Sequence, residues 1–302
     1  MNSRLLAVRF SLWFIVVIGL TSQNLQAAVY KYQDKHGRWQ FSDRPPLDKS
    51  VQAETLVFKP TPENPRALKF DYRRDGEAYI AEVINPFYIA VEVKVTFATP
   101  PKNHRKLVVP SRGRALIYTG ATPTPKFNYQ YVWGSPKATT PLTSYQIPVR
   151  SSSKHKISQS FHGSFSHHQQ PSLYAVDIAL PIGTDIVAAR AGTVVYVKDD
   201  YAFGGAHSYF LDKANSVSVL HEDGSYATYA HLLMGSVAVT AGQSVNAGDL
   251  LGQSGTSGFS TGPHLHFVVR KNAGFKTESI PFTFEHPNGN FTPQPKQIVC
   301  PC

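Results

Sequence analysis

The stretch Gly262-Pro-His-Leu-His-Phe-Val-Val269 places two histidines two residues apart in an apolar β-strand. Successive side chains of a strand point to opposite faces, so His264 and His266 project from the same face, about 6.6 Å apart along the backbone. One imidazole can then bind a metal ion while the other faces a water molecule beside that metal. This strand therefore predicts one wall of a metal site, whose other ligands must come from elsewhere in the chain.

Asp177 is the first of these further candidates. It lies in Leu173-Tyr-Ala-Val-Asp-Ile-Ala-Leu180, an otherwise apolar strand, where a carboxylate costs several kcal/mol unless a cation or hydrogen bonds compensate it. His167 precedes it by ten residues in Gly163-Ser-Phe-Ser-His-His168. The neighbouring His168 is an alternative, because adjacent residues of an extended chain point to opposite faces and only one can face the metal.

His231 closes another alternating strand, Ser225-Tyr-Ala-Thr-Tyr-Ala-His-Leu232. Two histidines and one carboxylate match the usual catalytic zinc set, which has three protein ligands and leaves a fourth position for water. The remaining histidines would act on that water and on the bond to be cut. We interpret His155, His162 and His286 as solvated loop residues. We expect His207 at the rim of the site and His221 as a structural residue at the end of a strand.

In their order along the chain these residues resemble the lysostaphin-like (LytM-type) zinc metallopeptidases, which cut peptidoglycan peptides. The matching segments run from about Ser160 to Pro281: Tyr174–Thr184, Ala188–Val195, His221–Tyr226, Tyr229–Leu232, Gly242–Gly248 and Ser254–Phe267. The resemblance implies that His167, Asp177 and His266 bind Zn²⁺. It also implies that His231 and His264 are catalytic, polarising the water and stabilising the tetrahedral oxyanion. The family's commonest first motif spaces histidine and aspartate by four residues rather than ten, so His168 stays open as a ligand.

Two other functions compete with a peptidase. The pattern Ala241-Gly-Gln-Ser-Val-Asn-Ala-Gly-Asp-Leu-Leu-Gly252 resembles biotinyl and lipoyl carrier barrels, but no lysine that could carry the cofactor lies between Lys213 and Arg270. The stronger rival is a catalytically inactive LytM-like module that binds the cell wall and regulates other wall hydrolases. All five candidate positions are filled here, which favours an enzyme.

The front of the chain predicts two accessory modules. Val29–Pro46 reads as a hairpin around the turn Asp34-Lys-His-Gly37, and it resembles a small N-terminal module of unknown function found in proteobacterial envelope proteins. Short alternating strands separated by Pro and Gly then suggest a β-sandwich. The predicted fold class is mainly β, with these bounds: signal peptide 1–27, hairpin module 28–60, β-sandwich 66–150, barrel-sandwich-like LytM-type catalytic domain 151–285 and C-terminal tail 286–302.

The first 27 residues have the layout of a secretory signal. Arg4 and Arg9 precede an apolar run from Leu12 to Leu20, and small residues follow at Ala27 and Ala28. We therefore expect an exported protein in the periplasm or outside the cell. The only two cysteines, Cys300 and Cys302, lie at the very end and do not staple the fold; their role is left open.

Composition and charge limit the partners. With 42% hydrophobic residues and 17% charged, the chain is neither disordered nor a disulfide-stapled mini-domain. Residues 28–150 carry 19 Lys+Arg against 10 Asp+Glu, whereas residues 151–302 carry 9 against 10. We expect the basic half to meet an anionic envelope polymer or membrane surface, and we expect no nucleic acid. The resemblance to the LytM-type peptidases and to the envelope module implies the substrate: the peptide stems of peptidoglycan, cut at the D-alanyl to diaminopimelate cross-link.

Overall fold

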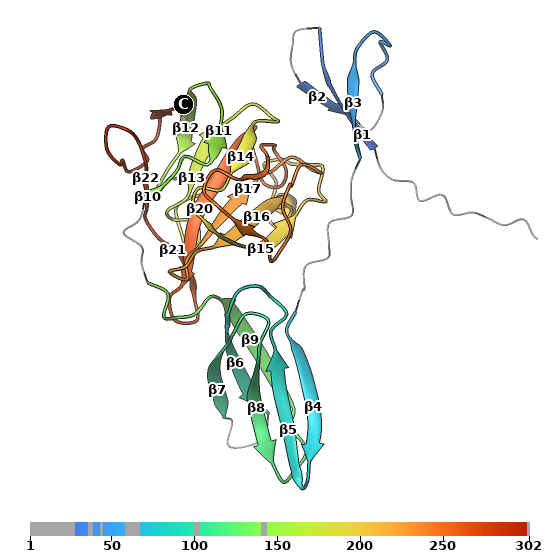
Figure 1. The fold of residues 1–302 in the computed structure, drawn as a ribbon, viewed down its shortest axis with the longest axis vertical. Coiled ribbons are helices and arrows are strands. Elements are labelled where there is room, and N and C mark those ends of the chain that lie inside the picture. Colours follow the sequence, from blue (N-terminus) through green and yellow to red (C-terminus); the bar gives the residue numbers. More distant parts are fainter. Residues whose placement is uncertain are drawn as a thin grey trace, which may run out of the picture. The chain divides into compact units, whose positions relative to one another are not determined.

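The computed structural model describes residues 28–35, 39–42, 45–57, 67–98, 103–139 and 144–300 (Figure 1). In these ranges the chain is nearly all β; its one helical turn is a 3₁₀ turn, η1 (Ser208–Phe210). The prediction of a mainly β fold is thus confirmed. The predicted signal peptide, residues 60–65 and Cys302 fall outside the described residues. Within the described ranges, no helix has the length and apolarity needed to cross a membrane.

The N-terminal unit, residues 1–58, contains a three-stranded antiparallel sheet of order β2-β1-β3. Its strands are β1 (Ala28–Gln33), β2 (Trp39–Ser42) and β3 (Ala53–Val57). The predicted hairpin accounts for β1 and β2 only. The third strand pairs with the open edge of β1, from Ala28 opposite Val57 to Tyr32 opposite Ala53. A lone hairpin is marginally stable in water, and this added strand extends it to a three-stranded sheet.

The second unit, residues 59–302, begins with two facing three-stranded sheets, which form the sandwich. One has the order β4-β5-β8 and the other β7-β6-β9. Strict alternation in β6 buries Val91, Val93 and Val95 completely. The strands are β4 (Lys69–Asp75), β5 (Ala78–Ile84), β6 (Val91–Phe97), β7 (His104–Val109), β8 (Arg114–Gly120) and β9 (Phe127–Trp133).

The back half is built on a sheet of nine strands in the order β18-β15-β16-β17-β20-β13-β12-β23, with β21 paired to β20. Two smaller sheets, β11-β14-β19 and β10-β22, contribute buried side chains to the same apolar core as this sheet. The bounds are β10 (Ser144–Tyr145), β11 (Val149–Arg150), β12 (His155–Gln159), β13 (Val176–Ala179), β14 (Asp185–Val187), β15 (Gly192–Lys198), β16 (Ser216–Leu220), β17 (Tyr226–Ala230), β18 (Ser244–Val245), β19 (Leu250–Gln253), β20 (His264–Asn272), β21 (Thr277–Ser279), β22 (Thr283–Phe284) and β23 (Ile298–Val299).

The segment 286–302, expected as a tail, contributes to this sheet. Within it, β23 pairs antiparallel with β12, His155 lying opposite Val299. The Ser160 hydroxyl also donates to the Pro293 carbonyl at 2.8 Å. These contacts show that the last residues hold the outer edge of a strand that leads to the candidate site.

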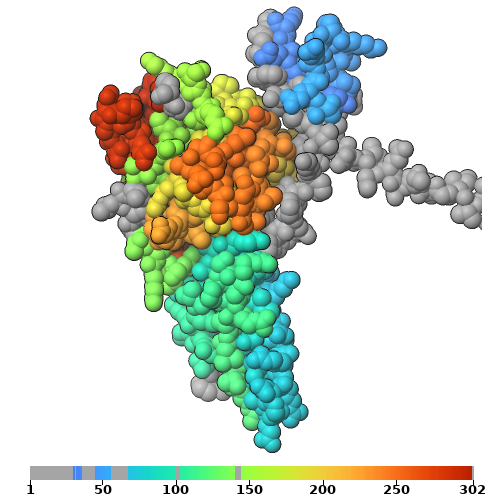
Figure 2. All heavy atoms as spheres, in the orientation of Figure 1, coloured from blue at the N-terminus to red at the C-terminus, as the bar shows by residue number. Residues whose placement is uncertain are grey.

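The sandwich and the back half lie in contact in Figure 2, and one apolar core contains side chains of both. Val195 and Tyr226, both from the large sheet, are buried in the core of the sandwich. The Trp133 ring lies 6.1 Å from that of Tyr226 and 5.8 Å from that of Tyr196. Because the two parts bury each other's apolar surface, the sandwich is an integral part of the fold of residues 59–302.

A buried polar contact reinforces this junction. The Glu92 carboxylate accepts hydrogen bonds from Asn272 Nδ2 at 2.8 Å and from the Phe275 backbone N–H at 2.7 Å. Replacing Glu92 by Ala removes two hydrogen bonds to a carboxylate, while Asn272 Nδ2 keeps the Gly134 carbonyl and the Phe275 N–H keeps Asn272 Oδ1. We expect a loss of about 1–3 kcal/mol in the free energy of unfolding. Denaturant unfolding of Glu92→Ala measures this loss. The exposed Glu77→Ala serves as control, and equal effects of the two variants would contradict the assignment.

Candidate metal and catalytic site

Four neighbouring strands bring the predicted residues into one row. In the antiparallel register, His266 on β20 lies opposite Asp177 on β13, and Asp177 lies opposite Gln159 on β12. On the other side of β20, His266 pairs with Ala230, the last residue of β17, so His231 follows directly. Residues far apart in sequence therefore meet because the strands that carry them are neighbours.

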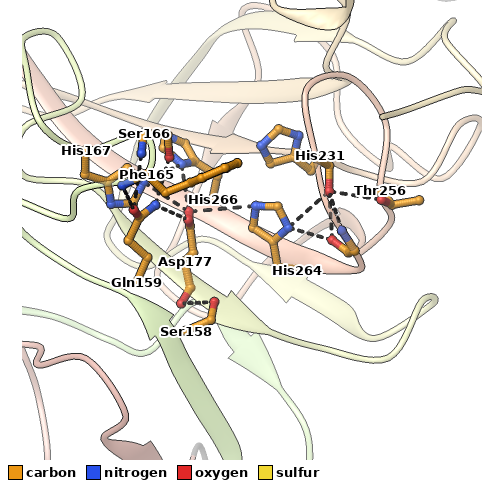
Figure 3. Close-up of polar contacts among 12 residues, drawn as sticks. Ser158, Gln159, Phe165, Ser166, His167, Asp177, His231, Thr256, His264 and His266 are labelled. Carbon is orange, nitrogen blue, oxygen red and sulfur yellow. Dashed lines mark hydrogen bonds and ion pairs between the residues drawn. The ribbon is translucent and has the colours of Figure 1, made fainter. Parts of the chain in front are cut away.

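Three side chains converge on one point (Figure 3). The atoms His167 Nε2, Asp177 Oδ1 and His266 Nδ1 lie 2.9–3.3 Å from one another. Zinc–nitrogen and zinc–oxygen bonds of about 2.0–2.2 Å in a tetrahedron hold neighbouring ligand atoms about 3.3 Å apart. The donor set and its spacing therefore fit zinc.

The structure distinguishes between the two adjacent histidines. The His167 side chain is fully buried within the cluster, whereas His168 is exposed. The backbone thus points His167, and not His168, toward Asp177.

Backbone carbonyls fix the orientation of three imidazoles. Nδ1 of His167 lies 3.1 Å from the Ser160 oxygen, Nδ1 of His231 lies 2.7 Å from the Ser257 oxygen, and Nδ1 of His264 lies 2.8 Å from the Gly262 oxygen. A carbonyl accepts only, so Nδ1 is the protonated nitrogen in each ring. Each Nε2 is then left with a lone pair, free to bind a metal or accept a proton.

The pKa values of Asp177 and His231 are both lowered, with opposite effects on their charge at neutral pH. Burial by itself would raise the pKa of Asp177, but hydrogen bonds with His167 and His266 outweigh it and hold that pKa well below its usual value. Burial lowers the pKa of His231 to about 3, and the neighbouring His264 and His266 act in the same direction. At neutral pH the site therefore contains an ionised aspartate and a neutral His231.

His231 and His264 form a pair beside the metal ligands. Their ring centroids are 4.5 Å apart, and His264 Nε2 lies 3.8 Å from Asp177 Oδ1. His231 has a φ of 65°, a left-handed conformation that is uncommon for a residue with a side chain. This backbone turn directly follows β17 and places the imidazole at the end of that strand.

The five residues border or underlie one groove with a volume of about 870 Å³. Asp177, His231, His264 and His266 line it directly, and His167 is buried behind them. The exposed Phe165 stacks on Phe259 along its rim, with ring centroids 5.9 Å apart. An extended peptide can therefore reach the metal ligands and the histidine pair from solvent.

The remaining histidines lie outside the cluster, and one differs from expectation. His155 is not a solvated loop residue, because it begins β12 and is buried. His221 is buried as predicted for a structural residue, and its Nδ1 lies 2.9 Å from the Ala191 oxygen. His162, His207 and His286 are exposed.

The burial of His221 predicts a pH dependence of stability. Desolvation lowers the pKa of His221 to about 4 in the folded chain, whereas an unfolded histidine titrates near 6.5. The unfolded state then binds more protons between these values, so stability falls as the pH drops from about 6.5 to 4, by about 3 kcal/mol for this group. Unfolding of the wild type and His221→Asn across this range measures the slope. An equally steep slope in the variant would refute the prediction.

The sequence did not reveal the residues that orient the metal ligands and the catalytic histidines. Gln159 Nε2 donates to Asp177 Oδ2 at 2.9 Å, and the buried Ser257 supplies the carbonyl that orients His231. The local sequence gives no signal for Gln159, because its position depends on a shift of register between two strands.

Comparisons with known proteins bear on the same region. Residues 172–277 match the family described as Peptidase family M23, and residues 18–67 match a domain of unknown function, DUF4124. Lysostaphin of Staphylococcus simulans is 35% identical over 101 residues, 33% of this chain and 18% of that protein. The DD-carboxypeptidase/endopeptidase Mpg of Neisseria gonorrhoeae is 31% identical over 114 residues, 36% of this chain and 24% of that protein. The matches thus span a quarter or less of these relatives' own length.

Among solved structures, the chain is similar to a mutant catalytic domain of the prophage-encoded M23 protein EnpA from Enterococcus faecalis. The identity is 27%, with 44% of this chain and 92% of that chain covered, at a TM-score of 0.32. The matched range 172–277 contains four of the five clustered residues, Asp177, His231, His264 and His266, and His167 lies just before it. The back half of this chain is therefore similar to peptidase family M23 over residues 172–277.

Proposed function

We propose that this chain is an exported zinc metalloendopeptidase that hydrolyses the peptide cross-links of peptidoglycan, at the bond between D-alanine and diaminopimelate. The observation that carries the proposal is the convergence of His167, Asp177 and His266 on one point, with the His231–His264 pair beside them in an open groove. The similarity to lysostaphin and to a DD-carboxypeptidase/endopeptidase supports the substrate class.

Each side chain then has a distinct task. His167, Asp177 and His266 hold the zinc, which when bound supplies Lewis acidity for activating water and polarising a carbonyl. The Ser257 carbonyl holds Nδ1 of His231 and leaves the lone pair on Nε2 to take a proton from the attacking water. His264 lies beside it, and once protonated on Nε2 it can donate a hydrogen bond to the developing oxyanion.

Digestion of purified sacculi tests this function. The zinc-loaded full chain should release new muropeptides that end in D-alanine and carry a free amine on diaminopimelate. Addition of a chelator should stop the release, and added zinc should restore it. Sacculi left intact by the zinc-loaded chain would favour the inactive regulatory module over the enzyme.

We further propose that the basic front half docks on an anionic polymer of the envelope. Residues 28–150 carry 19 Lys+Arg against 10 Asp+Glu, which favours attraction to phosphate-rich or carboxylate-rich surfaces. Binding of the full chain to sacculi in co-sedimentation should then weaken as salt rises, because exposed charges are screened over about 8 Å at about 0.15 M ionic strength. Binding that is insensitive to salt would argue against this docking.

A further inference from the structure

Gln159 contacts Asp177, one of the three candidate metal ligands, from a position that lies outside all of the sequence motifs. Asp177 offers Oδ1 to His167 and His266, and its second oxygen, Oδ2, accepts a hydrogen bond from Gln159 Nε2 at 2.9 Å (Figure 3). Because Asp177 is buried, this oxygen would otherwise lack a donor from the surrounding described residues. The amide thus fixes the plane of the carboxylate and leaves Oδ1 directed at the two histidines.

The same amide also holds the loop that carries His167. Gln159 Oε1 accepts from the backbone N–H groups of Phe165 at 3.1 Å and Ser166 at 3.2 Å, and Nε2 donates to the Ser166 hydroxyl at 2.8 Å. The next residue, Ser160, supplies the carbonyl that orients the His167 ring. The end of β12 therefore fixes two of the three ligands at once.

Two local features bring the amide to this place. The pairing of β12 with β13 shifts register between Ile157 and Gln159, so Gln159 rather than Ser158 lies opposite Asp177. The loop passes close over the amide at Gly163, where a Cβ would lie 2.4 Å from Gln159 Cγ. The shift of register directs the Gln159 side chain toward Asp177, and Gly163 leaves room for that side chain.

An amide suits both neighbours where other side chains would not. The carboxylate oxygen needs a donor and the two loop N–H groups need an acceptor, and among side chains of this length only glutamine offers both without charge. A lysine or arginine would neutralise Asp177 and compete with a metal cation for it. We propose that Gln159 is a positioning residue, whose amide presets Asp177 and the His167 loop in the arrangement that a bound metal requires.

This inference rests on the proposed zinc site, and metal affinity tests it separately from turnover. Zinc is titrated into metal-free full-length chains against a competing chromophoric chelator, and the unfolding temperatures of the metal-free chains are recorded. Gln159→Met should weaken zinc binding by about 10- to 100-fold, because supporting hydrogen bonds orient the ligands. The absorption spectrum of bound Co²⁺ should change as well, since it reports the ligand geometry.

Gln170→Met is the matched control. Gln170 makes three comparable hydrogen bonds with Ser279 but none with the cluster, so its loss should lower the unfolding temperature and leave zinc affinity unchanged. Equal losses of affinity in both glutamine variants would reduce Gln159 to a structural residue and overturn the inference. If the wild type and Gln159→Met bind zinc equally tightly, the positioning role of Gln159 is wrong but the proposed function stands. If the wild type binds no zinc, both the positioning role and the proposed function are wrong.

Gly163→Ala provides a second route if Gln159→Met does not fold. The added methyl displaces the Gln159 side chain without removing it, and the variant retains both zinc-binding histidines in the sequence. We expect weaker zinc binding in this variant too. Unchanged affinity in a folded Gly163→Ala chain would contradict the positioning role.

Discussion

Purified wild-type chain should hold about one zinc ion, and Asp177→Ala or His266→Ala should lose it, with at least a 10-fold drop in affinity. The reason is geometric, since each variant removes one of three atoms that converge within about 3 Å of one another. Asp177→Ala also removes the negative charge between the two imidazoles, so it should have the larger effect. Hydrolysis of peptidoglycan should fall to background in both variants.

Elemental analysis after exhaustive dialysis measures the zinc content directly. His168→Ala is the matched control, because this exposed neighbour of His167 points away from the cluster and should keep its zinc and its activity. Full retention of zinc by both Asp177→Ala and His266→Ala would refute the assignment of the ligands.

The second large effect concerns the histidine pair. His231→Ala and His264→Ala should keep the zinc and the fold but lose turnover by about 10²-fold or more, because one removes the acceptor of the water's proton and the other a hydrogen-bond donor to the oxyanion. Neither imidazole takes part in the cluster of three ligand atoms. The loss should therefore fall on kcat, whereas the metal content stays at the wild-type value.

Initial rates of muropeptide release from zinc-loaded variants check this expectation. The exposed His286→Ala, remote from the groove, should behave as wild type. If His231→Ala and His264→Ala both release muropeptides at the wild-type rate, the pair is structural, and the assignment of the two catalytic residues is wrong.

Much of the site could be predicted because strand geometry is local. The two-residue spacing of His264 and His266 fixes their common face, and a carboxylate within the apolar strand around Asp177 signals a compensating partner. The alternation of Val91, Val93 and Val95 likewise predicts a strand of the sandwich. These inferences need only the side-chain period of a β-strand.

What could not be predicted depends on pairing between distant segments. The role of Gln159 follows from a bulge, and the place of Ile298–Val299 follows from pairing with β12 by a strand too short to have a pattern of its own. The choice of His167 over His168 depends on the turn before β13. The burial of Tyr226 in the sandwich core reflects contact between two parts whose sequences show no reciprocal signal.

The strand β20 carries His264 and His266 at its first residues and Asn272, which contacts Glu92, at its last. His266 is 89 residues from Asp177 and 99 residues from His167 along the chain. Contacts of such long range form late, because the entropy of closing a long loop opposes them until the strands between are in place. A chain still being synthesised therefore lacks the complete set of three converging side chains until β20 has been made and has paired with β13, and the proposed activity can arise only after that pairing.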